Sequence, residues 1–251
     1  MTGLGLATDA LVNDGIVRRV REGDRVVLDT PARRDYWFGH GFVLDAPPDA
    51  ARAAALVAQG RRRFSALGAA RFVLQWERAY DVPAAHLETV AETLRDRSLV
   101  MVYDGPAPAA DPRVVDHGER WDEASALAAD EYSEFGDFTR WRFDCVRRDV
   151  DAGRARVVGI REHDRLLATV GLYRGVGIAR FVTPVTRPEA RGQGLFAACA
   201  RTLIAWANAD APRRVVIVAD ARGGPVEFYR RLGFVPASYL EAVIVACCVR
   251  G

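Results

Sequence analysis

The segment Thr186–Phe196 contains the residues of this chain that are best suited to bind an anion. It reads TRPEARGQGLF and joins an apolar, strand-like run to a run with helical spacing. Amides at the start of a helix lack acceptors, the helix dipole is positive there, and glycines let a ligand approach the backbone closely. An arginine adds charge and hydrogen-bond donors. The pattern predicts a phosphate-binding turn formed by Arg191, Gly192, Gln193, Gly194, Leu195 and Phe196.

A second interpretation of this pattern stays open, because a tight turn before a core-packing helix can also contain two glycines. The expected helix, Gly192–Asn208, carries an apolar stripe of Phe196, Cys199, Leu203 and Trp206. This stripe indicates that the helix packs on another element whether or not its start binds an anion.

Two motifs in order resemble the signatures of the GNAT (GCN5-related N-acetyltransferase) superfamily. RGQGLF at residues 191–196 resembles Q/R-x-x-G-x-G/A, and FYRRLGF at 228–234 resembles aromatic-Tyr-x-x-x-Gly-Phe. One helix and one apolar strand are expected between them, as in that superfamily, and the resemblance covers about Val114 to Val249. Phe196 stands where Gly or Ala is usual. Its ring could crowd a pyrophosphate or pack into the core with the stripe, and we favour packing.

The resemblance implies acetyl-CoA as cosubstrate and coenzyme A as product. The amides of Gln193, Gly194, Leu195 and Phe196 would then bind the pyrophosphate, and Arg191 and Gly192 would complete the loop. The end of the preceding strand, formed by Pro184, Val185 and Thr186, would pair with the pantetheine arm. This strand is expected to splay from Arg214–Ala219, and a proline is tolerated at a bulge or where pairing ends.

The implied chemistry is attack by an amine on a thioester, in which the leaving thiolate needs a proton. By the same resemblance, Tyr229 stands at the position of that acid. A tyrosine hydroxyl can fill this role because it stays protonated at neutral pH. The other interpretation is a tyrosine packed on the sheet. The expected strand Ile178–Thr186 offers no carboxylate as a general base. Asp220 and Glu134 are weak candidates that fit capping or solvated roles as well, and water or an already neutral amine could serve.

The composition of the chain disfavours several classes of function. The chain has 251 residues, 50% of them hydrophobic, and a formal net charge of +2. Its one basic cluster, Arg61–Arg63, fits a solvated helix end, so no nucleic-acid partner is expected. No apolar run is long enough to span a membrane. The four cysteines lack metal-like spacing and are expected to be reduced structural residues of a cytoplasmic protein without a metal site: Cys145, Cys199, Cys247 and Cys248.

Periodicity and turn residues predict the elements. A turn-rich stretch is expected at Thr2–Gly23. Strands are expected at Arg25–Asp29, Tyr36–Leu44, Arg71–Trp76, Leu99–Tyr103, Ala155–Ile160, Leu166–Leu172, Ile178–Thr186, Arg214–Ala219 and Ala242–Val249. Helices are expected after a cap at Asp49, at Ala84–Arg95, Asp122–Glu131, Phe138–Val150, Gly192–Asn208 and Val226–Leu232. The strands around His163–Asp164 should form a hairpin.

A proline-rich stretch without periodicity, Gly105–Pro112, is the candidate linker. It divides the chain into an N-terminal domain, 1–108, and a C-terminal domain, 113–251. Both are expected to be α/β with a mixed sheet. The resemblance implies a degenerate, non-catalytic GNAT-like first domain and a catalytic second one, a tandem type.

The expected function is transfer of an acetyl (acyl) group from acetyl-CoA to a primary amine. The acceptor is expected to be a small molecule, shaped in part by Tyr132–Trp141, and the protein a monomer or homodimer. The alternative is an acyl-CoA-binding pseudoenzyme or regulatory module without turnover. A Rossmann-type nucleotide protein is disfavoured, because its three-glycine fingerprint near the first strand is missing.

Overall fold

The computed structural model describes residues 3–82, 93–117, 120–131, 137–223 and 225–247. The chain divides into two compact units. Unit 1 comprises residues 1–101, 218–227 and 236–251, and unit 2 comprises residues 102–217 and 228–235. The boundary therefore falls within strands β5, β10 and β11 and within helix α6, as the bounds below show.

Unit 1 contains a mixed sheet with the strand order β1-β2-β3-β4-β11-β5. Neighbours are antiparallel from β1 to β3 and between β4 and β11, whereas β3 and β4 are parallel. The elements are α1 (Leu4–Val12), β1 (Arg18–Glu22), β2 (Arg25–Asp29), the 3₁₀ helix η1 (Trp37–Gly39), β3 (Gly41–Leu44), α2 (Ala50–Ala66), β4 (Arg71–Ala79), β5 (Thr93–Tyr103) and β11 (Phe234–Ala246).

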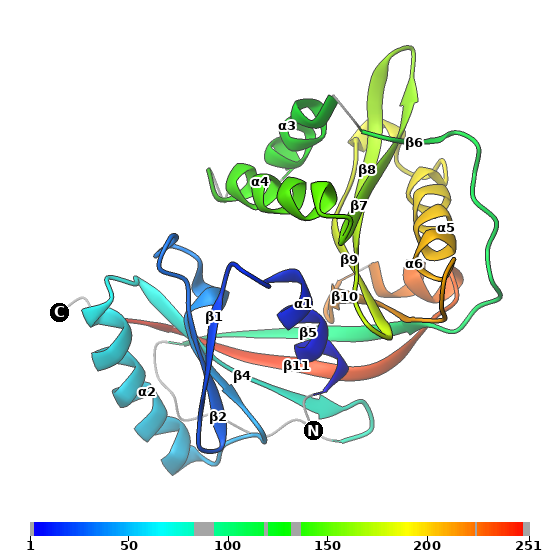
Figure 1. Ribbon diagram of the computed structural model, residues 1–251. Helices are drawn as coiled ribbons and strands as arrows, with labels where there is room; N and C mark the ends of the chain where they lie inside the picture. Colours follow the sequence, from blue (N-terminus) through cyan, green and yellow to red (C-terminus); the bar gives the residue numbers. More distant parts are fainter. Residues whose placement is uncertain (1–2, 83–92, 118–119, 132–136, 224, 248–251) are drawn as a thin grey trace. The chain divides into compact units, whose positions relative to one another are not determined.

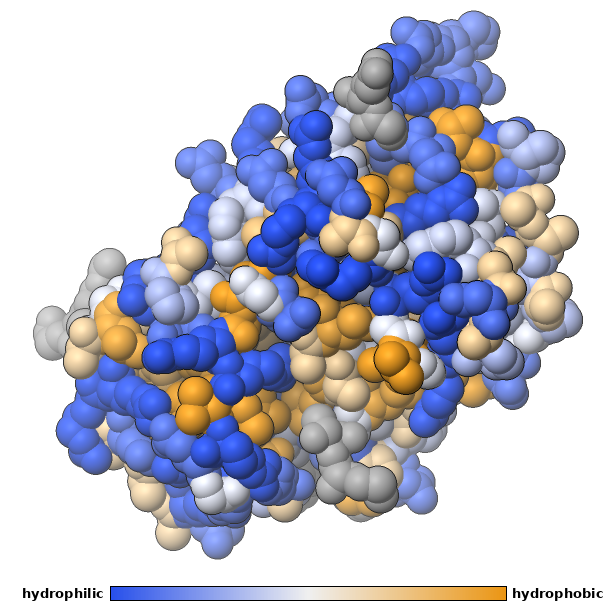
Figure 2. All heavy atoms as spheres, viewed as in Figure 1, coloured by the Kyte–Doolittle hydropathy of each residue, from blue (hydrophilic) through white to orange (hydrophobic). Residues whose placement is uncertain are grey.

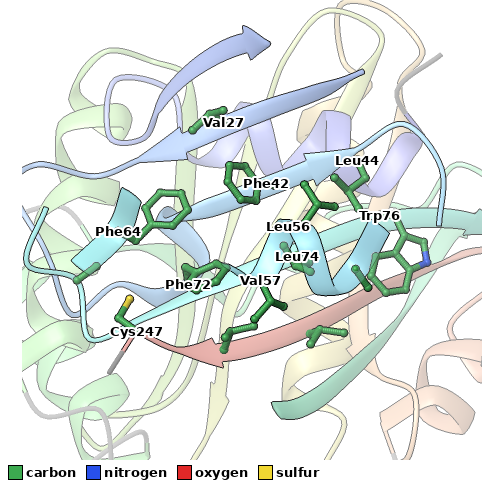
Figure 3. Packing of buried hydrophobic residues seen from close by; sticks show 14 residues of the cluster. Val27, Phe42, Leu44, Leu56, Val57, Phe64, Phe72, Leu74, Trp76 and Cys247 are labelled. Atoms are coloured by element: carbon green, nitrogen blue, oxygen red, sulfur yellow. The ribbon is translucent and has the colours of Figure 1, made fainter. Parts of the chain in front are cut away.

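The core of unit 1 lies between α2 and one face of this sheet. Alternate residues of β4 point to this face, namely Phe72, Leu74 and Trp76, and they meet the apolar side of α2 (Figure 3). Glu77 points to the opposite face, where its carboxylate accepts the amides of Gly5 and Leu6 at the start of α1. The two helices therefore cover opposite faces of the sheet.

Unit 2 contains a mixed sheet with the order β10-β9-β8-β7-β6, in which only β9 and β10 are parallel. Helices α3 and α4 contact one face and α5 contacts the other (Figure 1). The elements are β6 (Val114–Asp116), α3 (Trp121–Glu131), α4 (Asp137–Asp151), β7 (Ala155–Glu162), β8 (Arg165–Arg174), β9 (Ile178–Thr186), the 3₁₀ helix η4 (Pro188–Ala190), α5 (Leu195–Ala207), β10 (Arg214–Asp220) and α6 (Pro225–Arg231).

Most of the predicted elements are confirmed, and the reasons are local. His163 and Asp164 both have positive φ, +46° and +65°, which is the geometry of the two-residue turn that closes a twisted hairpin. The Asp49 carboxylate accepts the Arg52 amide at 2.8 Å and caps α2. Gly233, with φ of +99°, follows α6. Residues 105–111, within the predicted linker, form neither helix nor strand.

Several predicted boundaries are wrong. The N-terminal stretch is not only turns, because it forms α1 and β1. The segment Trp37–Gly39 is a 3₁₀ helix rather than part of a strand. Strand β5 begins at Thr93, inside the range expected to be helical, and residues 84–92 of that range lie outside the described residues. Strand β11 begins at Phe234 rather than Ala242.

The surface is largely hydrophilic on the face drawn in Figure 2, where apolar residues occur in small groups. Among the helices of the described residues, none is both long and apolar enough to cross a membrane. Within the described residues, Cys145, Cys199 and Cys247 form no disulfide. Burial raises the pKa of the Cys199 thiol to about 12, so this cysteine stays protonated and packs as an apolar group.

Candidate functional site

The predicted phosphate turn lies in unit 2 between β9 and α5. Pro188 opens the 3₁₀ helix η4 after the strand ends, and the chain then turns through Gly192 and Gly194. Both glycines are left-handed, with φ of +78° and +74°, and no heavy atom lies within 4 Å of the place that a Cβ would occupy. The turn therefore depends on glycine and is open on its outer side.

The amides of this turn have no partners. Within the described residues, no acceptor is found for the N–H groups of Gly192, Gln193, Gly194, Leu195 and Phe196. The first hydrogen bond of α5 is the one from the Ala198 amide to the Gly194 carbonyl, at 3.1 Å. Five consecutive backbone donors without acceptors among the described residues, at a helix start, form a ready site for an anion.

The helix behind the turn is firmly anchored. Its side chains Cys199 and Leu203 are fully buried, as the predicted stripe requires, while Phe196 is half-buried. The Phe196 ring lies 5.5 Å from Phe228 and 5.9 Å from Tyr229, centroid to centroid. Phe196 thus packs in an aromatic cluster, as favoured from the sequence.

The predicted arginine of the turn is held by an acid. Arg191 Nη2 lies 2.6 Å from Glu131 Oε1 at the end of α3, and Arg191 Nε donates to the Thr186 carbonyl at 3.2 Å. Both charged side chains remain partly exposed. An anion that reached the turn would meet a guanidinium already positioned there, with Glu131 as its competitor.

Strand β9 carries a β-bulge at its end. Val182 pairs with Gly171 and Val185 pairs with Thr169, so three steps on β9 oppose two on β8. The extra residue places Thr183 and Pro184 at the bulge. Thr183 has φ of +46°, which a β-branched residue adopts only under strain, and its Oγ1 is buried without a partner. Sequence analysis missed Thr183, and the proline beside it was the available signal.

The expected splay between β9 and β10 is present in the pairing pattern. The two strands pair only from Ile178 to Arg180 on β9 and from Arg214 to Val216 on β10. Beyond Arg180, β9 has no described partner in β10 over its last six residues. On its other edge, Val185 and Thr186 still pair with β8. Over 181–186, β9 is not paired with β10, and an edge of this kind can pair with a ligand.

Tyr229 lies in the same aromatic cluster and is only 8% exposed. Its ring centroid lies 6.2 Å from that of Phe234. Two carboxylates are the predicted candidates for a general base. Asp220 is exposed, and its pKa is lowered by the Arg222 amide and guanidinium, while Glu134 lies outside the described residues. Of the acceptor segment 132–141, residues 132–136 lie outside them too, and Phe138 packs on Trp141 at 5.5 Å.

The arrangement combines an open glycine turn, a row of amides without acceptors among the described residues and a strand end that β10 does not pair, and this geometry suits an extended anionic ligand. The sequence of residues 119–234, a little less than half of the chain, matches the family model of the acetyltransferase (GNAT) family. The matched segment contains both motifs that resemble the superfamily's signatures, residues 191–196 and 228–234.

Solved structures agree on the fold. A GCN5-related N-acetyltransferase from Kribbella flavida is 20% identical, with a TM-score of 0.62, covering 98% of this chain and 96% of that one. A putative GNAT-family acetyltransferase from Novosphingobium aromaticivorans is 23% identical, with a TM-score of 0.57 over 97% and 94%. A functionally unknown conserved protein from Staphylococcus epidermidis is 11% identical, with a TM-score of 0.76 over 92% and 94%. No curated protein matches the chain.

Proposed function

We propose that the protein is an acyl-CoA-dependent N-acyltransferase that moves an acetyl group from acetyl-CoA to the primary amine of a small molecule. One observation carries the proposal: five consecutive amides, Gly192 to Phe196, have no acceptor among the described residues at the start of an anchored helix. A diphosphate supplies the acceptors that these donors lack.

The residues fit the cosubstrate. The open turn and the unpaired amides would hold the pyrophosphate, with Arg191 adding charge. The end of β9, at Pro184, Val185 and Thr186, would pair with the amides of the pantetheine arm. Acetyl-CoA would supply the acyl group as a thioester. As the amine nitrogen bonds to the carbonyl carbon and the C–S bond breaks, the Tyr229 hydroxyl would donate a proton to the leaving sulfur and recover one from the amine through solvent.

The remaining parts of the proposal concern the roles of the two domains, the cellular location and the oligomeric state. We assign catalysis to the C-terminal domain, 113–251, and a non-catalytic, GNAT-like role to residues 1–108. We place the protein in the cytoplasm as a monomer or homodimer. The free thiols of the described cysteines are in keeping with a reducing compartment.

A thiol-release assay with acetyl-CoA and a panel of small primary amines tests the reaction. Turnover should appear with at least one amine. Tyr229→Phe should then reduce turnover by about 10²-fold or more with nearly unchanged affinity for coenzyme A. Tyr80→Phe, at an exposed tyrosine of unit 1, is the matched control and should behave as the wild type. Unchanged turnover in Tyr229→Phe would remove Tyr229 from the mechanism.

A pseudoenzyme that binds acyl-CoA without turnover is the second candidate. It is favoured by the lack of a carboxylate on β9 and by the pairing of Asp220 with Arg222. Such a protein would bind coenzyme A and release no thiol with any amine. A saturating ligand at 100-fold over Kd stabilises a protein by about 2.7 kcal/mol, so thermal unfolding detects binding in either case.

A further inference from the structure

Unit 1 contains a cavity of about 170 Å³ that the proposed reaction does not use. Strands β4, β5 and β11 and the turn after β10 line it, chiefly with Trp76, Arg95, Asp96, Arg97, Arg222 and Glu241. The Ala221 amide donates to the Arg97 carbonyl, which fixes the turn beside β5. A protein cavity of about 150 Å³ holds one benzene molecule, so this one can hold a molecule of about six to eight non-hydrogen atoms.

Asp96 contributes a carboxylate to this cavity, which accepts hydrogen bonds from the Ser98 side chain and the Arg97 amide. Its side chain is half-buried, and no guanidinium of the described residues forms an ion pair with it. Burial raises the pKa of the Asp96 carboxyl, and the nearby charge of Asp220 raises it further. The Arg222 guanidinium, which pairs with Asp220 at 3.3 Å, opposes this shift without forming an ion pair with Asp96. An ammonium group in the cavity would supply the ion pair that Asp96 lacks.

Three other residues that line the cavity carry hydrogen-bond donors without acceptors among the described residues. The Trp76 indole N–H is buried without an acceptor, and Figure 3 shows its nitrogen on the side of the ring away from the apolar cluster. Arg97 and Arg222 use only their Nε atoms, toward Glu241 and Asp220, so their Nη donors have no acceptor in the described part of the chain. A planar carboxylate matches such donors.

The acid on this wall other than Asp96 is already satisfied. Glu241 is buried and accepts from Arg78 Nε at 2.8 Å and from Arg97 Nε at 3.0 Å. A simple anion would leave Asp96 without a cation, and a simple amine would leave the buried Trp76 indole N–H without an acceptor. A molecule with both charges would match both groups.

We propose that this cavity binds a small amphoteric molecule of amino-acid size, with its ammonium on Asp96 and its carboxylate on the Trp76 indole and the neighbouring guanidinium groups. The site is separate from the acyl-CoA proposal, because none of its lining residues lies in the phosphate turn or on β9.

The test uses the full chain labelled with ¹⁵N and no coenzyme A. The indole N–H resonance of Trp76, assigned by its loss in Trp76→Phe, is followed while glycine, β-alanine, ethylamine or propionate is added. The two amphoteric probes should shift this resonance saturably and at lower concentration than ethylamine or propionate. No saturable shift with glycine or β-alanine, or equal binding of all four probes, would overturn the proposal.

Two variants identify the contacts by calorimetry with the tighter amphoteric probe. Asp96→Asn should weaken binding by at least about 10-fold, and Trp76→Phe, which keeps the ring, by about 2- to 10-fold. Asp144→Asn, at an exposed aspartate of α4, is the matched control and should keep the wild-type affinity. Wild-type affinity in Asp96→Asn would sink the proposal; if that variant does not fold, Trp76→Phe decides. A failure here leaves thiol release from acetyl-CoA untouched, so the two proposals fail separately.

Discussion

The Gly194→Ala variant tests whether the phosphate turn binds coenzyme A as well as starting α5. The chain offers a matched control for this variant at Gly153. Gly194 precedes α5 with φ of +74°, and Gly153 follows α4 with φ of +72°. Neither has any heavy atom within 4 Å of the place that a Cβ would occupy. Alanine at either position therefore meets the same backbone strain and no clash within the protein.

The magnitudes follow from this geometry. A left-handed alanine costs about 1–2 kcal/mol relative to glycine, partly offset by the lower entropy of the unfolded alanine chain. Both variants should lose about 1 kcal/mol of stability, or about 2–4 °C in Tm. At Gly194 the new methyl group also fills the open side of the turn. Loss of even one hydrogen bond to a charged phosphate weakens binding by about 10- to 150-fold.

Urea unfolding and calorimetry with coenzyme A measure the two quantities on the same samples. The expected result is equal destabilisation of Gly194→Ala and Gly153→Ala, with a loss of coenzyme A affinity in Gly194→Ala alone. If Gly194→Ala bound coenzyme A as tightly as Gly153→Ala, the diphosphate would not dock on this turn, and the assignment of the site would be wrong.

Three further variants probe groups around the site. Glu131→Gln removes the ion pair of Arg191, and an exposed pair contributes about 0–1 kcal/mol. This variant should therefore raise the affinity for coenzyme A, measured by calorimetry, by up to about 5-fold. A weaker affinity would mean that Glu131 positions Arg191. Thr183→Val keeps the shape but removes the partnerless hydroxyl, and should raise the free energy of unfolding by about 1 kcal/mol in urea; a loss would show that this hydroxyl has a partner in solution. Burial, and to a smaller extent a nearby arginine, lowers the pKa of His117 to about 4 in the folded protein. As the pH falls, His117 therefore takes up a proton in the unfolded protein before it does so in the folded one. The wild type should therefore lose about 3 kcal/mol of stability between about pH 6.5 and 4, and His117→Gln, which retains a donor for Thr169, should show a shallower pH dependence in urea titrations.

The phosphate turn and the strands around it could be predicted because their signals are local. Strand β9 matches its predicted bounds, Ile178–Thr186, since apolar residues and β-branched side chains fill it between turn residues. The helix after the turn was predicted from its stripe. Its start was placed at Gly192, three residues early, because helical spacing alone does not show which residues are left-handed.

The features that the sequence did not predict depend on contacts between residues far apart in the chain. Helix α1 has weak periodicity, and its first amides are satisfied by Glu77, more than 70 residues away. The segment before β3 is set by His40, which is fully buried with its Nδ1 3.3 Å from Asp29. The pairing of Arg191 with Glu131 spans 60 residues. No local pattern predicts such partners.

The site combines a rigid base with a destabilised surface. Behind the turn, Leu203 and Cys199 are fully buried, and this packing fixes the helix start without help from the turn itself. At the surface lie two left-handed glycines, five unpaired amides and, one strand end away, Thr183 in a strained conformation. None of these stabilises the ligand-free protein, and a backbone that retains such features where the core does not require them is typical of binding sites. Because the donors are held in place before a ligand arrives, little ordering entropy opposes binding, and the affinity of the turn for a diphosphate is set by how many of its amides the ligand can reach.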